Sequence, residues 1–399
     1  MDFWRHIEYT EIIALEHRMP APYEKLETYQ PPLYYLINSF IVPDSLLTNK
    51  TAHINFVELL SMIYGAISLF IILWLIQQVS NNVFAQLITI SFIATTPKFL
   101  FNFCTYSNDS LSTMFCIAVS AIAYKLYKKW SWDFAILLLV LATCGIYTKY
   151  TMIWCIFIIS IICSKNLLKL RLPNKFQIGI IGILLTSVLL FMPWAFFHNY
   201  HHSGKLLPFR SVDEHMMLRG IDIPEHIRTL KTILKVPILS YTPQEWSDPW
   251  VHPWLESELA HPATKKNDYL SYIFISSIIG EFEFSKPNII VIWIILWIHL
   301  FVYLLCLKEI FRSDFTKLAL SVILLSHLTH ILNLARLKTP FTGFFMDYRF
   351  LLWNSIAWAI LYVSALSAKS KLSKEISTLL STTMIIGIIF QVYFLMTAS

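Results

Sequence analysis

Hydrophobic residues are grouped into ten stretches that are separated by polar segments. Most of these stretches approach the length of about 20 apolar residues that a helix needs to cross a membrane. They lie near residues 56–78, 84–101, 107–124, 132–148, 150–163, 176–197, 288–307, 316–333, 350–366 and 376–396. Thr148-Lys149-Tyr150 separates the fourth stretch from the fifth. These two stretches form either two separate helices or one long helix with a kink. We therefore predict an all-α polytopic membrane protein of about 10–11 transmembrane helices, with short interfacial helices in its outer loops.

Positive charge is divided unequally between the short loops on the two sides of the membrane. One side carries Lys125, Lys128, Lys129, Lys165, Lys169, Arg171, Lys175, Lys308, Arg312, Lys317, Lys369, Lys371 and Lys374, and the other carries Lys149, Arg336, Lys338 and Arg349. Cytoplasmic loops are enriched in Lys and Arg, so the first side is predicted to be cytoplasmic. Residues 1–55, 102–107, 198–287 and 334–349 are then expected to lie outside.

The composition supports an integral membrane protein, because 56% of the residues are hydrophobic and only 14% are charged. The net charge of +6 comes largely from loops that would contact anionic lipid, so we expect membrane lipids and no nucleic acid as partners. Cysteines are few and lack CxxC spacing, which predicts neither a disulfide framework nor a zinc site.

The N-terminal segment combines an amphipathic helix at residues 2–18 with a rigid turn at Pro31-Pro32. Asp2 would begin the helix, either as its N-cap or as a functional acid. A short apolar helix is expected to follow the prolines as far as about Val42. Residues 1–55 need a span to carry them across the membrane, so we expect about 20 apolar residues to precede Met1.

Other polar residues lie at the predicted outer ends of the spans. Asn108 and Asp109 begin the stretch 107–124, and an acid at a membrane boundary suggests a functional role. The alternative is that Ser107 or Asn108 simply caps the helix. Lys149 either extends its amine toward the membrane surface or binds a phosphate. Arg349 would suit a phosphate as a bidentate ligand, or would pair with Asp347.

Two further outer features have both a structural and a functional interpretation. His198, His201 and His202 invite a metal site, but their spacing lacks the helical pair that favours one. The long loop 198–287 interleaves tryptophans with acids, which suits either carbohydrate binding or anchoring to the membrane surface.

The order of these motifs resembles that of the GT-C membrane glycosyltransferases, especially the bacterial glycosyltransferase family 39 branch with its aminoarabinose transferases and protein mannosyltransferase relatives. The resemblance covers most of the chain. Its matches are Asp2 to His6 with Tyr9, Tyr29-Gln30-Pro31-Pro32-Leu33-Tyr34-Tyr35, Asn108-Asp109-Ser110-Leu111, Tyr147-Thr148-Lys149-Tyr150, Pro193-Trp194 with His198-Asn199 and Gly204, Ile279-Gly280-Glu281-Phe282, and Asp347-Tyr348-Arg349-Phe350.

The resemblance implies a GT-C-type bundle that transfers a sugar from a polyprenyl-phosphate carrier to an acceptor at the extracytoplasmic face. It implies that the protein lies in the cell membrane, which in a bacterium would be the inner membrane. Asp2 would be the catalytic base and Asp109 a second catalytic acid. The substrate-binding residues would be His6, Gln30, Tyr34, Tyr35, Asn108, Lys149, His198, Asn199 and Arg349. No cofactor other than the donor lipid is assigned, and a divalent metal is left open.

The same reading divides the chain into four regions. Residues 1–55 form the first extracytoplasmic loop with the catalytic acid, 56–197 the N-terminal transmembrane bundle, 198–287 the long outer loop, and 288–399 the C-terminal transmembrane helices.

The sequence departs from the family pattern in two places. Phe3 follows Asp2 where the family has a second acid, so that acid is missing or its role is taken by Glu8 or Glu11. His198 stands where the family has an arginine. A flippase or transporter of lipid-linked sugars, and an inactive relative that binds the lipid carrier, are the alternative functions.

Overall fold

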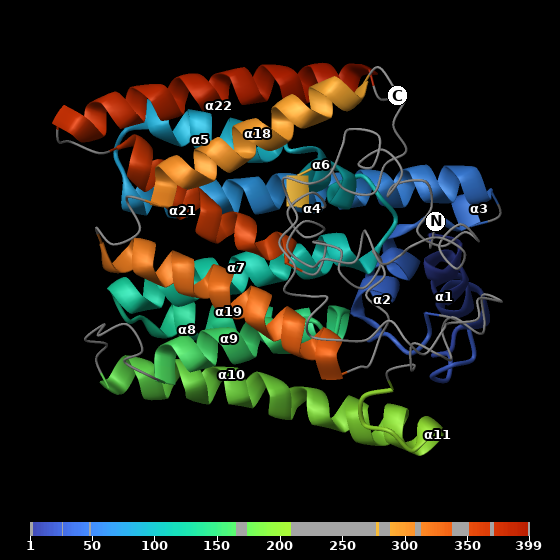
Figure 1. Ribbon diagram of the computed structural model, residues 1–399. Helices are drawn as coiled ribbons and strands as arrows, with labels where there is room; N and C mark the ends of the chain where they lie inside the picture. The colour runs from blue at the N-terminus through green and yellow to red at the C-terminus, as the bar shows by residue number, and fades with distance from the viewer. Residues whose placement is uncertain are drawn as a thin grey trace. The chain divides into compact units, whose positions relative to one another are not determined.

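The computed structural model describes residues 3–25, 27–47, 49–164, 174–208, 277–278, 288–307, 313–336, 351–367 and 371–397. Every regular element in these ranges is a helix, which confirms the predicted all-α class (Figure 1). Asp2 and Arg349 lie outside the described residues.

The helices follow the predicted apolar stretches closely. The first part of the chain forms α1 (Phe3–Glu16), α2 (Leu33–Ile41), α3 (Asp44–Leu47), α4 (Lys50–Val79), α5 (Val83–Ala94), α6 (Pro97–Phe103), α7 (Asn108–Lys128), α8 (Trp132–Thr148) and α9 (Met152–Ser164). Next come α10 (Asn174–Trp194), a π-helix (Ala195–Tyr200) and α11 (His201–Ser203). The last part forms α18 (Asn288–Leu307), α19 (Asp314–Arg336), a 3-10 turn (Leu352–Asn354), α21 (Ser355–Leu366) and α22 (Lys371–Thr397).

Several of these helices are long and apolar enough to cross a membrane. Four described segments meet this test, namely Lys50–Val79, Asn108–Leu126, Ile178–Ser203 and Lys374–Thr397. The pair α5 and α6, bent by 65°, makes a fifth candidate. The remaining apolar helices contain shorter apolar segments of 10–17 residues, such as Ile290–Cys306 in α18 and Thr316–Leu332 in α19. Membrane-spanning character is thus supported, whereas the number of ten spans stays a prediction.

Side-chain caps explain where three of the helices begin. Asn82, Ser107 and Ser131 each accept a hydrogen bond from a backbone N–H in the first turn of α5, α7 and α8, respectively. At its other end, α8 stops at Thr148, and Lys149 is extended with φ −159° and ψ 138°. The two apolar stretches on either side of Lys149 are therefore separate helices, and the alternative of one kinked helix is wrong.

The chain divides into two compact units, Met1–Leu75 with Asn102–Phe209 and Ile76–Phe101 with Arg210–Ser399. In the first unit, α8 packs between α7 and α10, and α9 packs against all three (Figure 1). Side-chain bonds join the start of α7 to the end of α8, and the residues before α9 to the π-helix after α10. These four ends therefore lie together, and α1 and α2 pack beside them.

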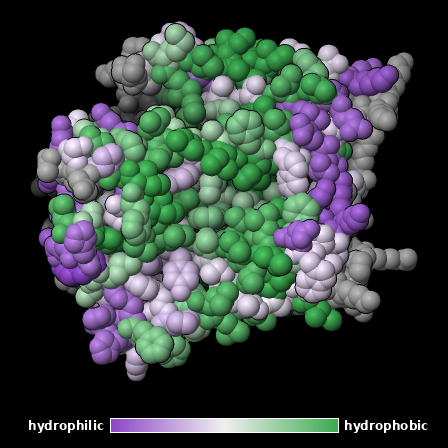
Figure 2. All heavy atoms as spheres, turned by 180° about the vertical axis from the view of Figure 1, so that it is seen from behind, coloured by the Kyte–Doolittle hydropathy of each residue, from purple (hydrophilic) through white to green (hydrophobic). Residues whose placement is uncertain are grey.

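In the second unit, α5, α18, α21 and α22 pack against one another. A buried polar chain joins three of these helices: Thr95 donates to Gln391 Oε1 at 2.5 Å, and Gln391 Nε2 donates to His299 Nε2 at 2.6 Å. Hydrophobic side chains cover much of the molecular face in Figure 2. Large exposed apolar residues such as Phe70 and Phe197 suit a surface that contacts lipid.

Candidate functional site

A buried ion pair lies where α7 begins and α8 ends. Ser107 caps α7 and thereby puts Asp109 in its first turn, while Lys149 is the C-cap of α8. Lys149 Nζ lies 2.5 Å from Asp109 Oδ1, and Ser107 Oγ donates to Oδ2 at 3.0 Å. The two charged side chains are only 10% and 12% exposed. Since removing two ions from water is costly, a pair at this depth is a candidate for function.

Asn108 adds hydrogen-bonding capacity next to this pair. Its side chain is buried, and neither its amide nitrogen nor its amide oxygen has a hydrogen-bond partner in the part of the chain that the structure describes. Buried side-chain amides normally have hydrogen-bond partners, so an amide without one is a candidate contact for a polar ligand. The start of α7 also carries partial positive charge from its unpaired backbone N–H groups. Asn108 and Lys149 together are suited to an anionic oxygen.

A cluster of aromatic and imidazole rings joins α1 to α2. His6 and Tyr9 are three residues apart and therefore share one face of α1. His6 Nδ1 lies 2.8 Å from the Tyr35 hydroxyl, and the Tyr9 ring stacks on the Tyr35 ring with centroids 3.8 Å apart. Tyr34 meets both His6 and Tyr35 edge-on. The rings thus form a rigid wall where α1 packs against α2.

Tyr106 connects this wall to the residues just before α7. Its hydroxyl lies 2.8 Å from Thr10 Oγ1 and 3.4 Å from His53 Nε2. Its ring also stacks on His6 at 6.3 Å. α1 is therefore fixed against the same end of the helices that carries Asp109.

Electrostatic neighbours extend the cluster in two directions. Burial, followed by the proximity of Tyr150, raises the pKa of Tyr9. Burial, followed by the carboxylate of Glu27, raises the pKa of Tyr35. Both tyrosines therefore remain neutral hydrogen-bond donors at physiological pH. Because Tyr150 follows Lys149 directly, the cluster lies next to the ion pair.

The end of α10 adds Asn199 to the site. Asn199 Nδ2 lies 3.0 Å from the Tyr150 hydroxyl and 3.0 Å from the Leu206 carbonyl oxygen. The neighbouring His198 instead stacks on Trp194 at 4.1 Å. No group of three or more metal-binding side chains occurs in the part of the chain that the structure describes.

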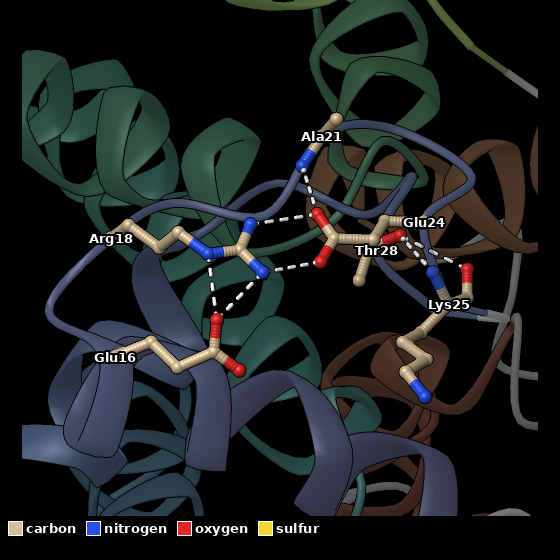
Figure 3. A network of polar contacts seen from close by, with 6 residues as sticks. All are labelled: Glu16, Arg18, Ala21, Glu24, Lys25 and Thr28. Carbon is tan, nitrogen blue, oxygen red and sulfur yellow. Dashed lines mark hydrogen bonds and ion pairs between the residues drawn. The ribbon is translucent and has the colours of Figure 1, made fainter.

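An ion-pair network fixes the loop between α1 and α2, as Figure 3 shows. The Arg18 guanidinium donates to both oxygens of Glu24, at 2.8 and 2.5 Å, and to Glu16 at 2.7 Å. The backbone N–H of Ala21 also donates to Glu24, at 3.0 Å. The hydrogen bonds from Arg18 lower the pKa of Glu24 to about 2.

The loop network should weaken in acid. Since the pKa of Glu24 is depressed, its stabilising contribution is complete above the ordinary value of 4.5 and is lost as the pH falls toward about 2. Amide hydrogen exchange of residues 17–25, corrected for its intrinsic pH dependence, should be faster at pH 3 than at pH 6. Arg18→Ala should show the fast exchange at both pH values. Equal protection at both pH values in the unaltered protein would contradict the network.

The structure brings together several of the predicted site residues. Asp109 contacts Lys149, His6 contacts Tyr34 and Tyr35, and Asn199 contacts the residue that follows Lys149. Gln30 contributes its backbone carbonyl, which accepts a 3.3 Å hydrogen bond from Tyr9. Asn108 lies beside Asp109, whereas His198 contacts Trp194 and no other predicted site residue among those described.

Three residues at this site are absent from the predicted site residues, although Tyr9 is one of the positions that match the family motif. Tyr9 has a detectable signal, because it lies one helical turn from His6 on the same face of α1. Tyr106 and Glu27 lie in segments without helical periodicity, and their burial depends on the tertiary structure.

No protein-family model matches this chain, and no curated protein is similar enough to count as a relative. The functional assignment therefore depends on the chemistry of the site.

Proposed function

We propose that the protein is an integral membrane glycosyltransferase of the GT-C type. It transfers a sugar from a polyprenyl-phosphate-linked donor to an acceptor at the extracytoplasmic face of the cell membrane. The observation that carries this proposal is the buried pair of Asp109 and Lys149 beside the unsatisfied amide of Asn108, at the ends of apolar helices.

Lys149 and Asn108 supply the groups that a lipid phosphate requires. An ammonium has three donors, so Lys149 has the capacity to bond both Asp109 and phosphate oxygens. Positive charge near the departing phosphate stabilises the negative charge that develops when the sugar leaves. Arg349, from the segment outside the described residues, is the second proposed phosphate ligand.

Carboxylates supply the other half of the reaction. As the acceptor oxygen bonds to the anomeric carbon and the phosphate leaves with its electron pair, the acceptor proton passes to a carboxylate base. Asp2 is the proposed base, and Asp109 holds Lys149 in position and completes the acid pair.

The surroundings of the site suit a donor that is part lipid. Apolar helices supply a hydrophobic environment for a prenyl chain, and the polar residues lie at helix ends where a phosphate would remain near water. We propose ten spans with this end outside, since Lys125, Lys128 and Lys129 lie at the opposite end of α7 from Asp109.

A gene deletion with complementation tests the proposed function. Loss of the transferase should cause a polyprenyl-phosphate sugar to accumulate, as measured by mass spectrometry of extracted lipids. The unaltered gene and Lys129→Ala, a change of an exposed lysine at the end of α7, should clear this lipid. Asp2→Asn should leave it accumulated at unchanged protein level. Lys149→Ala should leave it accumulated even when its expression is raised to the protein level of the unaltered gene, because loss of this buried charge also destabilises the fold.

Other outcomes would contradict the proposal. Full clearance by Lys149→Ala would remove the phosphate role of this residue. Movement of the lipid-linked sugar between leaflets without any new glycoside would indicate a flippase. Absence of any accumulated lipid in the deletion strain would refute the transferase function itself.

A further inference from the structure

Glu27 is a buried carboxylate that none of the proposed roles uses. The residue is only 6% exposed, in the segment between α1 and α2. No residue of the described ranges forms a hydrogen bond or an ion pair with its side chain. A buried carboxylate normally has a charged partner or several donors, because leaving it unpaired is costly. Among the described residues the carboxylate therefore lacks a donor, which a bound ligand would supply.

The backbone around Glu27 is held in place from both sides. Before it, Glu24 is fixed by Arg18, and Thr28 Oγ1 donates to the Lys25 carbonyl oxygen at 2.9 Å (Figure 3). After it, the N–H of Gln30 donates to the Glu27 carbonyl oxygen at 2.9 Å. The position of the carboxylate is thus set by a rigid turn, and relaxation of a loose loop does not explain its burial.

Glu27 lies next to the hydrogen-bonded pair of Tyr35 and His6. The turn that carries it is fixed to Tyr9 through the bond from the Tyr9 hydroxyl to the Gln30 carbonyl, and Tyr9 stacks directly on Tyr35. The negative charge of Glu27 is also the largest charge effect on Tyr35. Among the described residues the Tyr35 hydroxyl makes no hydrogen bond to Glu27 and is instead bonded to His6 Nδ1 at 2.8 Å.

The surroundings of the Glu27 carboxylate favour a hydroxyl group over an ammonium group as the donor. An ammonium ligand beside aromatic residues normally rests on an open ring face. Here Tyr9 and Tyr35 cover each other at 3.8 Å, and His6 and Tyr106 stack at 6.3 Å. A carboxylate accepts hydrogen bonds only, so a hydroxyl can satisfy it without an open ring.

We propose that the Glu27 carboxylate binds a hydroxyl group of a substrate, belonging either to the transferred sugar or to the acceptor. This inference rests on the proposed transferase function and adds a substrate-binding residue to it. Glu27, Tyr35, Tyr9 and Tyr150 form a continuous series of neighbours that ends beside Lys149, where the phosphate would bind.

Glu27→Gln tests this role because it keeps the size of the side chain and removes its charge. Purified variants are added to detergent-solubilised membranes of the deletion strain, which hold the accumulated lipid and the unreacted acceptor. Consumption of the lipid should be about 10- to 100-fold slower than with the unaltered protein, the usual effect of a hydrogen bond to a charged group. Glu375→Gln, a change of an exposed acid on α22, is the matched control and should have no effect.

Binding of the extracted donor lipid, measured by native mass spectrometry, identifies the source of the hydroxyl. Weaker donor binding in Glu27→Gln assigns the hydroxyl to the sugar, and unchanged donor binding assigns it to the acceptor. If Glu27→Gln consumes the lipid as fast as the unaltered protein, the inference is overturned although the transferase function stands. If the unaltered protein consumes none, the transferase function itself fails.

Thermal stability separates a ligand-binding role from a structural one. An unpaired buried carboxylate destabilises the folded state, so Glu27→Gln should keep or raise the melting temperature while activity falls. A melting temperature that falls together with activity would show that the carboxylate supports the fold, and would overturn the inference.

Discussion

Lys149→Met is expected to lower the free energy of unfolding by about 3–5 kcal/mol, the usual cost of removing one partner from a buried ion pair. The substitution removes the ammonium partner of the Asp109 carboxylate, which is only 12% exposed and keeps its hydrogen bond from Ser107. The methionine fills much of the space of the lysine stem, so the effect arises from charge and not from lost packing. Unfolding of the purified protein in detergent, followed by tryptophan fluorescence, measures the change.

The double variant Asp109→Asn/Lys149→Met separates the two contributions of the pair. It removes both charges, so most of the lost stability should return, whereas turnover of the lipid donor should not. Lys129→Met is the control, since Lys129 is exposed at the end of α7 and its loss should change stability little. If Lys149→Met alone were as stable as Lys129→Met, the two charges would not form a tightly coupled buried pair.

The positions of the helices could be predicted because each apolar stretch is long and is bounded by polar or capping residues. The predicted short helix after Pro31-Pro32 is observed as α2, which ends at Ile41. Ser107, one of two suggested caps, does cap α7. Such local signals depend on a few neighbouring residues and therefore survive without tertiary information.

Proline positions caused two differences from the predicted boundaries. The stretch 84–101 was expected to be one span, but Pro97 begins a new helix and the chain bends there by 65°. A proline favours the first turn of a helix and excludes the helical conformation from the residue before it. By contrast, Pro193 lies inside α10, and the helix continues through a π-helical turn to Ser203. The missing N–H of the proline alters the local hydrogen-bond pattern without ending the helix.

The site itself could be predicted only in part. Asp109 and Lys149 stand out because charges are rare at the ends of apolar stretches. Glu27 does not stand out, because glutamates are common in polar loops and only the tertiary structure reveals its burial. Glu8, which the sequence suggested as a replacement acid, is exposed on α1. Sequence spacing therefore identifies helix-end charges better than it identifies loop residues that fold inward.

Tyr9→Ala is expected to lower the free energy of unfolding by about 3–5 kcal/mol, as for other large buried aromatic residues. Tyr9 is completely buried, stacks on Tyr35 at 3.8 Å, and bonds to the Gln30 carbonyl. Its removal would leave a cavity between α1 and the turn that carries Glu27. Tyr9→Phe keeps the stacked ring and loses only the hydrogen bond, so its cost should be about 0.5–1.5 kcal/mol.

Activity of the two Tyr9 variants tests whether the ring wall positions the substrate groups. Tyr9→Phe should retain most of its turnover of the donor lipid, because the rings of α1 and α2 stay stacked and Glu27 keeps its place. Tyr9→Ala should lose turnover even at temperatures where it remains folded, because the turn at Glu27 is no longer fixed to the residues beside Lys149. If the folded Tyr9→Ala protein turned over the lipid normally, Glu27 and Lys149 would not need this wall between them, and the site would consist of two independent parts.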